Sequence, residues 1–168
     1  MGPRLFAGFF YLGKMKQYLL IIFLNLTTFN ALAELQAPIE NSCSFYLSLE
    51  QSIPCGPSGY TLDFGYPYCE KFLKSNFYRF SRRGKKFLIK NSFCLQEEIY
   101  KNYSENDNLT CKKLKNIAFS GHADCYIDSG FCDLSLFDKI ILTNVIKKQI
   151  PLKRVRAQMK EVLARCHN

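Results

Sequence analysis

The stretch SGHADCYIDSGFC, residues 120–132, is open to two interpretations. His122 precedes a Cys-Tyr pair by three residues, and a histidine held on a helix can act as the base that activates water in a hydrolase. Cys125 and Cys132 flank an Asp-Ser-Gly turn, which equally fits a disulfide frame between two helices. The first interpretation predicts an enzyme, and the second predicts a binding protein held together by disulfides.

The amino terminus has the order of a secretory signal. Basic residues precede an apolar run at 18–24, and the small residues Ala-Leu-Ala follow at 31–33. This order predicts a signal peptide over residues 1–33, for which Met15 is an alternative start. The apolar run is shorter than the roughly 20 residues of a membrane-spanning helix. We therefore expect a secreted, extracellular protein without stable membrane insertion.

All eight cysteines follow the predicted cleavage site. An even number of cysteines in an exported chain indicates disulfides, here four. Zinc is a poor alternative, because the chain has no Cys-x-x-Cys and only His122 and His167 as histidine ligands. We expect neither a metal nor another cofactor. The cysteines stand at positions 43, 55, 69, 94, 111, 125, 132 and 166.

Basic residues outnumber acidic ones in the predicted mature chain. Residues 34–168 carry 20 lysines and arginines against 14 aspartates and glutamates, a net charge of +6. This charge suits acidic glycans or acidic protein surfaces outside the cell, or it simply keeps the surface solvated. Nucleic acid is not an expected partner of an exported chain.

Helical spacing dominates the chain after residue 66. Pro67 suits the start of a first helix, Gly84 breaks the apolar stripe after it, and Ser135 is a suitable N-cap for the fourth helix. Residues 34–66 are rich in Pro, Gly and Ser, which predicts an irregular N-terminal arm. The predicted fold is all-α: a compact, disulfide-stapled bundle of about five helices over residues 67–168. The stripes after the first run over 87–99, 111–125, 135–145 and 152–166.

Two Asn-x-Ser/Thr sequons lie in the polar stretch KNYSENDNLT, residues 101–110. We interpret this stretch as a loop between the second and third helices, where a glycan can be accommodated. The sequons predict N-glycosylation at Asn102 and Asn108.

The enzyme interpretation fails on the residues around His122. Secreted phospholipases carry an aspartate directly after the histidine, but Ala123 stands there and Asp124 is turned about 100° away on a helix. Two consecutive cysteines should precede the histidine, where this chain has Ala118-Phe119, and no glycine-rich calcium loop lies upstream. We predict that the protein is not an enzyme, that it has no catalytic residues and that His122 is a partly exposed polar residue.

Positive charge is concentrated in YRFSRRGKK, residues 78–86. Three interpretations stay open for this run: a solvated turn between helices, a binding site for sulphated glycans, and a convertase cleavage site. The candidate basic binding patch consists of Arg79, Arg82, Arg83, Lys85 and Lys86.

The order of motifs along residues 66–166 resembles the stanniocalcin family of secreted helical glycoprotein hormones. YPYCEKFL (66–73) is similar to the family's Tyr-x-x-Cys-x-x-Phe-Leu, and FSRRGKKFLIKNSFCL (80–95) is similar in its Phe, Gly-Lys-x-Phe and Cys-Leu/Ile spacing. CYIDSGFC (125–132) resembles the family's Cys-Tyr-x5-Cys, and VLARC (162–166) resembles the end of its last core helix.

The resemblance implies a set of disulfides. Cys94 would pair with Cys125, and Cys132 with Cys166, while Cys69 and Cys111 would take partners from the arm. The simplest choice for the arm is Cys43–Cys69 and Cys55–Cys111, although sequence alone leaves the pairing open. The family's richer cysteine cluster before the first core helix, and its downstream cysteine that links two chains, have no counterpart here. A homodimer, if formed, is therefore not expected to be disulfide-linked.

For function, the resemblance implies a secreted glycoprotein hormone or extracellular regulator that acts by protein–protein recognition. Family members are associated with calcium and phosphate homeostasis and with inhibition of pappalysin-type metalloproteases, so the expected partner is an extracellular receptor or protease. The alternative is a secreted basic helical protein that binds glycans or membranes as a defence or host-interaction factor.

Overall fold

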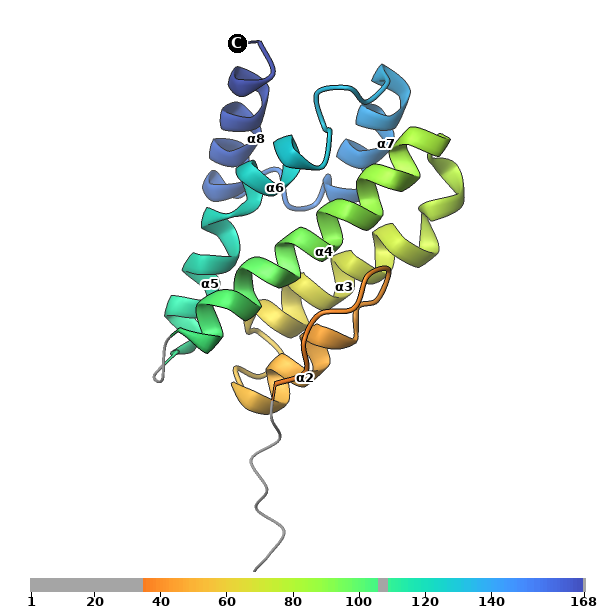
Figure 1. Ribbon diagram of the computed structural model, residues 1–168. Helices are drawn as coiled ribbons and strands as arrows, with labels where there is room; N and C mark the ends of the chain where they lie inside the picture. Colours follow the sequence, from red (N-terminus) through yellow and green to blue (C-terminus); the bar gives the residue numbers. More distant parts are fainter. Residues whose placement is uncertain (1–34, 106–108, 168) are drawn as a thin grey trace, which may run out of the picture. The chain divides into compact units, whose positions relative to one another are not determined.

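The computed structural model describes residues 35–105 and 109–167 (Figure 1). The predicted signal peptide over 1–33, the alternative start at Met15 and the sequon asparagine Asn108 lie outside the described residues. The chain divides into two units, 1–33 and 34–168, and the description below concerns the second.

The described part of the chain is helical and contains no strand, which confirms the all-α prediction. Short π-helical turns at Thr61–Gly65 and Lys71–Ser75 flank α3, and a 3-10 turn follows at Phe77–Arg79. None of the described helices is both long and apolar enough to span a membrane. In chain order the α-helices are α2 (Ser44–Ser52), α3 (Tyr66–Glu70), α4 (Arg82–Ser104), α5 (Cys111–Ser120), α6 (His122–Asp128), α7 (Leu136–Ile146) and α8 (Lys153–Arg165).

The prediction of an irregular arm over 34–66 is wrong. Helix α2 occupies nine residues of this segment, and its Phe45, Tyr46 and Leu49 are buried in the core. The π-helical turn at Thr61–Gly65 then continues directly into α3. The Pro, Gly and Ser residues that suggested irregularity are concentrated in the connection at 53–59, so their influence on the backbone is local.

Helix boundaries follow side-chain caps. Ser135 is the N-cap of α7 as predicted, and its hydroxyl accepts a hydrogen bond from the backbone N–H of Asp138 at 3.1 Å. Ser81 caps α4 in the same way, accepting from Gly84 at 3.1 Å, so Gly84 lies inside the helix and the predicted break there is wrong. The break between the first two predicted stripes falls a few residues earlier, at Phe80 and Ser81, whose backbone is extended. A separate break at Gly121 divides the stretch predicted as one helix over 111–125 into α5 and α6.

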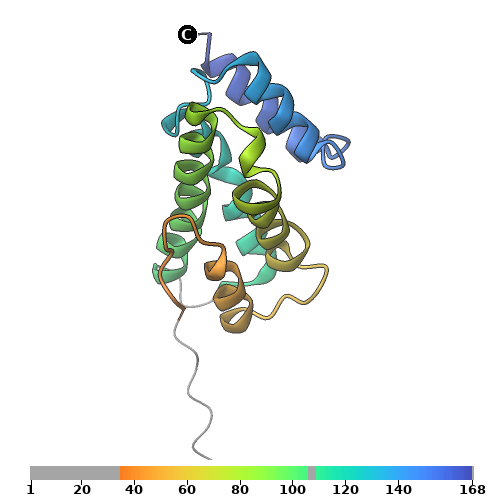
Figure 2. The ribbon, with the colours of Figure 1, turned by 90° about the vertical axis from the view of Figure 1, so that its right-hand side faces the viewer.

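Helix α4 is the longest described helix and contacts α5, α6 and the helical turns after α3. In Figures 1 and 2, α7 and α8 lie toward the end of α4 at which it begins, whereas α2 lies toward the opposite end. Helix α8 packs chiefly against α6. The core therefore surrounds α4, with α8 attached to it through α6.

Four disulfides tie these helices together. Their Cα–Cα distances are 5.9, 5.6, 5.6 and 5.2 Å in chain order, within the usual range for disulfides. They link the arm to α3, the arm to α5, α4 to α6, and the turn after α6 to the end of α8. The pairs are Cys43–Cys69, Cys55–Cys111, Cys94–Cys125 and Cys132–Cys166. The resemblance implies the last two of these pairs, and the first two are the simplest choice for the cysteines of the arm.

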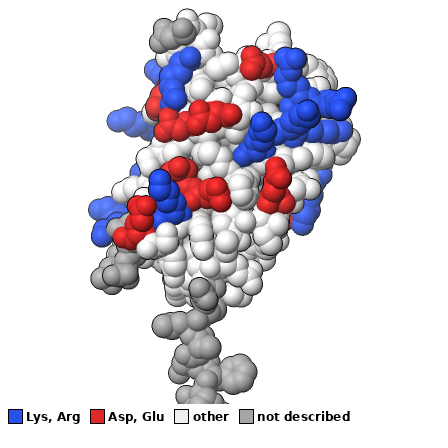
Figure 3. All heavy atoms as spheres, in the orientation of Figure 1, with Lys and Arg blue, Asp and Glu red and all other residues white. Residues whose placement is uncertain are grey.

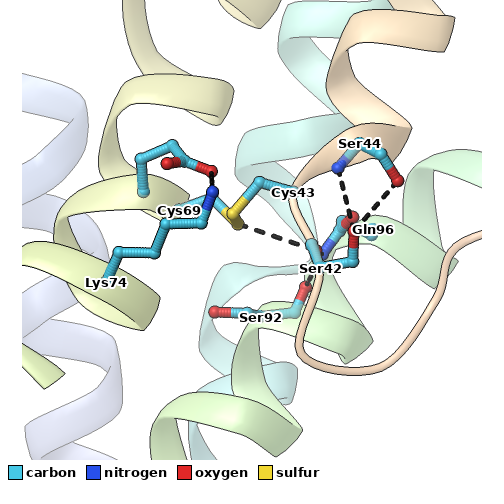
Figure 4. Close-up of a disulfide and its surroundings, with 8 residues drawn as sticks. Ser42, Cys43, Ser44, Cys69, Lys74, Ser92 and Gln96 are labelled. Carbon is cyan, nitrogen blue, oxygen red and sulfur yellow. Dashed lines mark hydrogen bonds and ion pairs between the residues drawn. A yellow bond between two sulfur atoms is a disulfide. The ribbon is translucent and has the colours of Figure 1, made fainter.

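Polar contacts reinforce the attachment of the arm. The carbonyl oxygen of Ser42, next to the Cys43–Cys69 disulfide, accepts a hydrogen bond of 2.9 Å from Nε2 of Gln96 in α4 (Figure 4). The same amide group also donates to the carbonyl of Ser92 at 2.9 Å. Because Gln96 is almost fully buried, these two bonds compensate for the desolvation of its amide nitrogen. The start of α2 is thus held to both α3 and α4.

Candidate functional site

The junction of α4 and α7 is built around one buried carboxylate. Asp138 is 0% exposed, and its Oδ1 accepts from the backbone N–H of Ser81 at 2.9 Å. Its Oδ2 accepts from the hydroxyls of Ser81 at 2.6 Å and Ser135 at 2.9 Å. Each of these two serines is also the N-cap of one of the helices. A single carboxylate therefore fixes the beginnings of both helices against each other.

Electrostatics favour the charged form of this carboxylate. Burial acts to raise the pKa of Asp138, but the hydrogen bonds from Ser81 and Ser135 outweigh it, and the net pKa is lowered. The ionised carboxylate can accept all three bonds at once, which a neutral side chain of the same size cannot do. The junction is consequently a preorganised part of the fold.

Two exposed arginines, Arg82 and Arg83, lie in the first turn of α4 next to this junction. The guanidinium of Arg83 donates to the backbone carbonyl of Asp133 at 3.0 Å, which places it beside the segment leading into α7. Arg82 is exposed and shares one face of α4 with the exposed Lys86, four residues later. Figure 3 shows Lys and Arg side chains gathered at the upper right of that view, where α4 begins.

The first turns of α7 expose three large apolar side chains. Leu136, Phe137 and Ile140 are 75%, 64% and 50% exposed. They share one side of the helix because residues three and four apart are neighbours on a helix surface. We call these residues, together with Arg82, Arg83 and Lys86, the α4–α7 surface.

The candidate basic patch is only partly brought together. Arg79 lies in the preceding 3-10 turn, where its guanidinium donates to Oδ1 of Asn76 at 2.9 Å. Lys85 is half-buried, with its ammonium 5.6 Å from the ring centroid of Phe77. Arg82, Arg83 and Lys86 lie on the first turns of α4 rather than in a turn between helices. The exposed apolar residues beside them were not predicted as part of a site.

The sequon at Asn102 does not lie in a loop as predicted. Helix α4 continues to Ser104, and the side-chain amide of Asn102 donates to the carbonyl of Glu98 at 2.7 Å. The polar composition of this stretch reflects the exposed end of a long helix. Glycosylation of Asn102 and Asn108 stays a prediction.

His122 is buried, which corrects the prediction of a partly exposed side chain. Only 8% of its surface is exposed, and its ring stacks on Phe119 with centroids 5.4 Å apart. Burial lowers its pKa to about 4, against the opposing effect of the hydrogen bond between Nδ1 and the carbonyl of Ala118. His122 lies four residues after Ala118 and three before Cys125, both of them buried, so helical spacing alone places it on the buried stripe.

The partner of the His122 ring is a backbone carbonyl and not a carboxylate or a nucleophile. Within residues 35–105 and 109–167, no three His, Cys, Asp or Glu side chains are grouped so that they could hold a metal ion. The surroundings of His122 in the described part of the chain are therefore those of a side chain packed in an aromatic core.

Taken together, the fold and its disulfides define a disulfide-stapled all-α domain. No protein-family model matches the chain, and neither does any curated protein or solved structure.

Proposed function

We propose that the protein is a secreted, stanniocalcin-like regulator that binds an extracellular protein, a receptor or a protease, through the α4–α7 surface. The observation that carries this proposal is the exposure of Leu136, Phe137 and Ile140 on α7, next to the segment that Arg83 of α4 contacts. Four disulfides are compatible with an extracellular setting, since disulfides persist in oxidising compartments.

The composition of the surface is that of a recognition site. Isolated apolar residues on a protein surface are ordinary, but three on adjacent turns of one helix form a patch that water solvates poorly. Aromatic side chains and arginine are enriched in the energetically dominant parts of interfaces. The buried Asp138 network holds α7 in place before binding, which lowers the ordering cost of association.

Inhibition of a pappalysin-type metalloprotease is the experiment that tests this function. The protein secreted from eukaryotic cells is titrated against the protease and its peptide substrate, as wild type and as the double variant Leu136→Ser/Phe137→Ser. Because both side chains are exposed, the variant should keep its fold and lose at least about tenfold in inhibition, as expected for truncation of two anchoring residues.

Ile39→Ser serves as the matched control, because Ile39 is also exposed but lies in the arm. Inhibition should be unchanged in this variant. Absence of inhibition by the wild-type protein, or equal inhibition by all three proteins, contradicts the proposal. If the surface instead binds a second copy of the chain, sedimentation velocity shows a concentration-dependent dimer that the double variant lacks.

Sulphated glycans are a second candidate partner, favoured by the exposed Arg82, Arg83 and Lys86 on consecutive turns. Retention on immobilised heparin should then fall clearly in Arg82→Ala/Lys86→Ala and stay near wild type in Lys112→Ala/Lys113→Ala, which removes two exposed charges from α5. Equal losses in the two variants indicate a non-specific charge effect and argue against a glycan site.

A further inference from the structure

A cavity of about 200 Å³ lies among α3, α4, α6, α7 and α8. It is separate from the α4–α7 surface, so the inference below does not depend on the proposed function. Its wall is mostly aromatic and aliphatic: Phe64, Tyr68, Phe72, Leu95, Phe131 and Leu142 all contribute to it. The cavity is partly open to solvent, so it is a pocket that a ligand can enter and not a closed void in the core.

The charge of the wall favours a neutral occupant. Among the lining residues, all of them in the described part of the chain, Lys139 is the single one with a formal charge. Its ammonium already donates to the carbonyl of Cys132 at 3.0 Å and lies 5.3 Å from the ring centroid of Phe131. An anion entering the cavity would lose its hydration in a mostly apolar environment, which is costly, and one ammonium would be its single charged partner.

Two side chains that line the cavity, Asn91 and His122, carry hydrogen-bond acceptors. The side-chain Oδ1 of Asn91 is buried and has no hydrogen-bond partner among the residues that the structure describes. The residue as a whole is also buried, with 7% of its surface exposed. His122 also lines the cavity, and its Nδ1 is paired with the carbonyl of Ala118. Because the imidazole is neutral, Nδ1 carries the proton in this pair and Nε2 is left as an acceptor.

Buried acceptors without donors cost free energy, and a ligand with an O–H group removes that cost. We infer that this cavity binds a small, neutral, hydroxylated apolar molecule, whose body packs among the aromatic rings and whose hydroxyl donates to Asn91 or His122. A cavity of about 150 Å³ accommodates benzene, so the ligand has on the order of ten non-hydrogen atoms.

Calorimetric titration with two isosteric probes tests the inference. The probes are 4-ethylphenol, which has the hydroxyl, and 4-ethyltoluene, which carries a methyl group in its place. Both should bind the wild-type protein, and 4-ethylbenzoate, which is an anion at neutral pH, should bind far more weakly. Absence of binding of both neutral probes, or tighter binding of the benzoate, overturns the inference.

Two substitutions locate the ligand. Leu95→Trp and Thr143→Phe each fill part of the cavity from a different helix, and each should abolish binding of both probes. Leu47→Trp is the matched control, because Leu47 is exposed on α2 and does not line the cavity. Far-UV circular dichroism verifies the fold of every variant. Undiminished binding in a folded Leu95→Trp or Thr143→Phe variant places the ligand elsewhere and overturns the inference.

The hydroxyl contact has its own readout. Asn91→Leu and His122→Phe each remove one acceptor. In at least one of these variants the preference for 4-ethylphenol over 4-ethyltoluene should fall by about fivefold, because one net hydrogen bond contributes about that factor to affinity. Asn144→Leu, an exposed position on α7, should leave the preference unchanged. If the preference is the same in all variants, the ligand is held by apolar contact alone and the inferred chemical class is wrong.

Discussion

The hydroxyl of Ser81 lies 2.6 Å from a carboxylate oxygen of Asp138, a residue 57 positions later in the chain. This contact and the hydrogen bond from the backbone N–H of Ser81 join the N-cap of α4 to the first turn of α7. The hydroxyl of Ser135, the N-cap of α7, donates to the same carboxylate. Residues that cap their own helices locally are thus also the partners that fix two helices against each other. Local helix stability and tertiary packing depend here on the same side chains.

Asp138→Asn should lower the free energy of unfolding by about 2 kcal/mol, because the amide cannot accept all of the buried donors and adds one of its own. Chemical denaturation at neutral pH measures this loss. Asp133→Asn, at an exposed carboxylate nearby, should change stability by less than about 0.5 kcal/mol. Equal stability of Asp138→Asn and the wild type would show that the carboxylate network contributes nothing.

The same substitution should change the response to acid. The pKa of Asp138 is lowered in the folded state, so its contribution is complete above the ordinary aspartate pKa of about 3.9 and is lost as the pH falls below it. The wild type should therefore lose stability more steeply than Asp138→Asn between pH 4 and its acid unfolding, with the melting temperature as the readout. Parallel curves for the two proteins contradict this prediction.

Gly84→Ala should destabilise the protein although alanine is the better helix former. The added Cβ would lie 2.7 Å from Oδ1 and 2.8 Å from Cγ of Asp138, a group that its hydrogen bonds hold in place. We expect the loss from overpacking, about 1–3 kcal/mol, to exceed the gain in helix propensity of about 1 kcal/mol.

Gly121→Ala is the matched comparison for Gly84→Ala. Its Cβ would approach Cγ of Glu98 at 3.2 Å, and that half-buried side chain can move aside. Thermal unfolding should show Gly121→Ala close to the wild type and Gly84→Ala clearly below it. The reverse order would mean that the approach of α7 to α4 is looser than the structure shows.

Sequence patterns predicted those features that depend on neighbours in the chain. The all-α fold and the cap at Ser135 follow from local spacing and side-chain chemistry. The helix predicted to start at Pro67 begins earlier, because the π-helical turn at Thr61–Gly65 continues directly into α3. The break at Gly84 was predicted wrongly because the reason for that glycine is the approach of Asp138, which is distant in sequence.

The candidate sites were less accessible to sequence reasoning. The basic run at 78–86 was visible as charge, but the apolar residues of α7 resembled an ordinary core stripe until the structure placed Phe137 and Ile140 outside the core. The cavity could not be predicted, since it is enclosed by residues from five helices that come together only in the fold. The burial of His122, by contrast, could be predicted, since this residue lies at helical spacing from the buried Ala118 and Cys125.

His122 should make stability depend on pH in a second window. Its pKa falls to about 4 on folding, because burial disfavours the imidazolium. As the pH falls below about 6.5, this histidine takes up a proton in the unfolded chain but stays neutral in the folded chain. The free energy of unfolding therefore decreases as the pH falls from about 6.5 toward 4. The shift corresponds to a loss of up to about 3 kcal/mol at the lower end.

The variant His122→Phe tests this pH dependence, because it keeps an aromatic ring beside Phe119 and removes the titrating group. Urea denaturation between pH 4 and 7 should show a shallower slope for His122→Phe than for the wild type. His167→Phe, at an exposed position near the end of the chain, should keep the wild-type slope. A wild-type slope in His122→Phe would mean that another group titrates in this window.

The last disulfide should matter mainly to α8. Only Val155 and Val162 of this helix are buried, and the ion pair of 2.6 Å between Arg165 and Asp124 is exposed and therefore worth little. The bond Cys132–Cys166 closes a loop with a sequence separation of 34, for which the chain-entropy model gives about 3–4 kcal/mol. This covalent link outweighs the other contacts that hold the end of α8.

Cys132→Ala/Cys166→Ala should thus release α8 and leave the centre of the fold intact. Native-state hydrogen exchange should show a loss of protection over Lys153–Arg165 that is much larger than any loss in α4, which is buried among several helices. Cys94→Ala/Cys125→Ala is the comparison, because that bond joins α4 to α6 and its removal should lower protection in both helices. An equal loss of protection in α4 and α8 after removal of Cys132–Cys166 would show that α8 unfolds only together with the core.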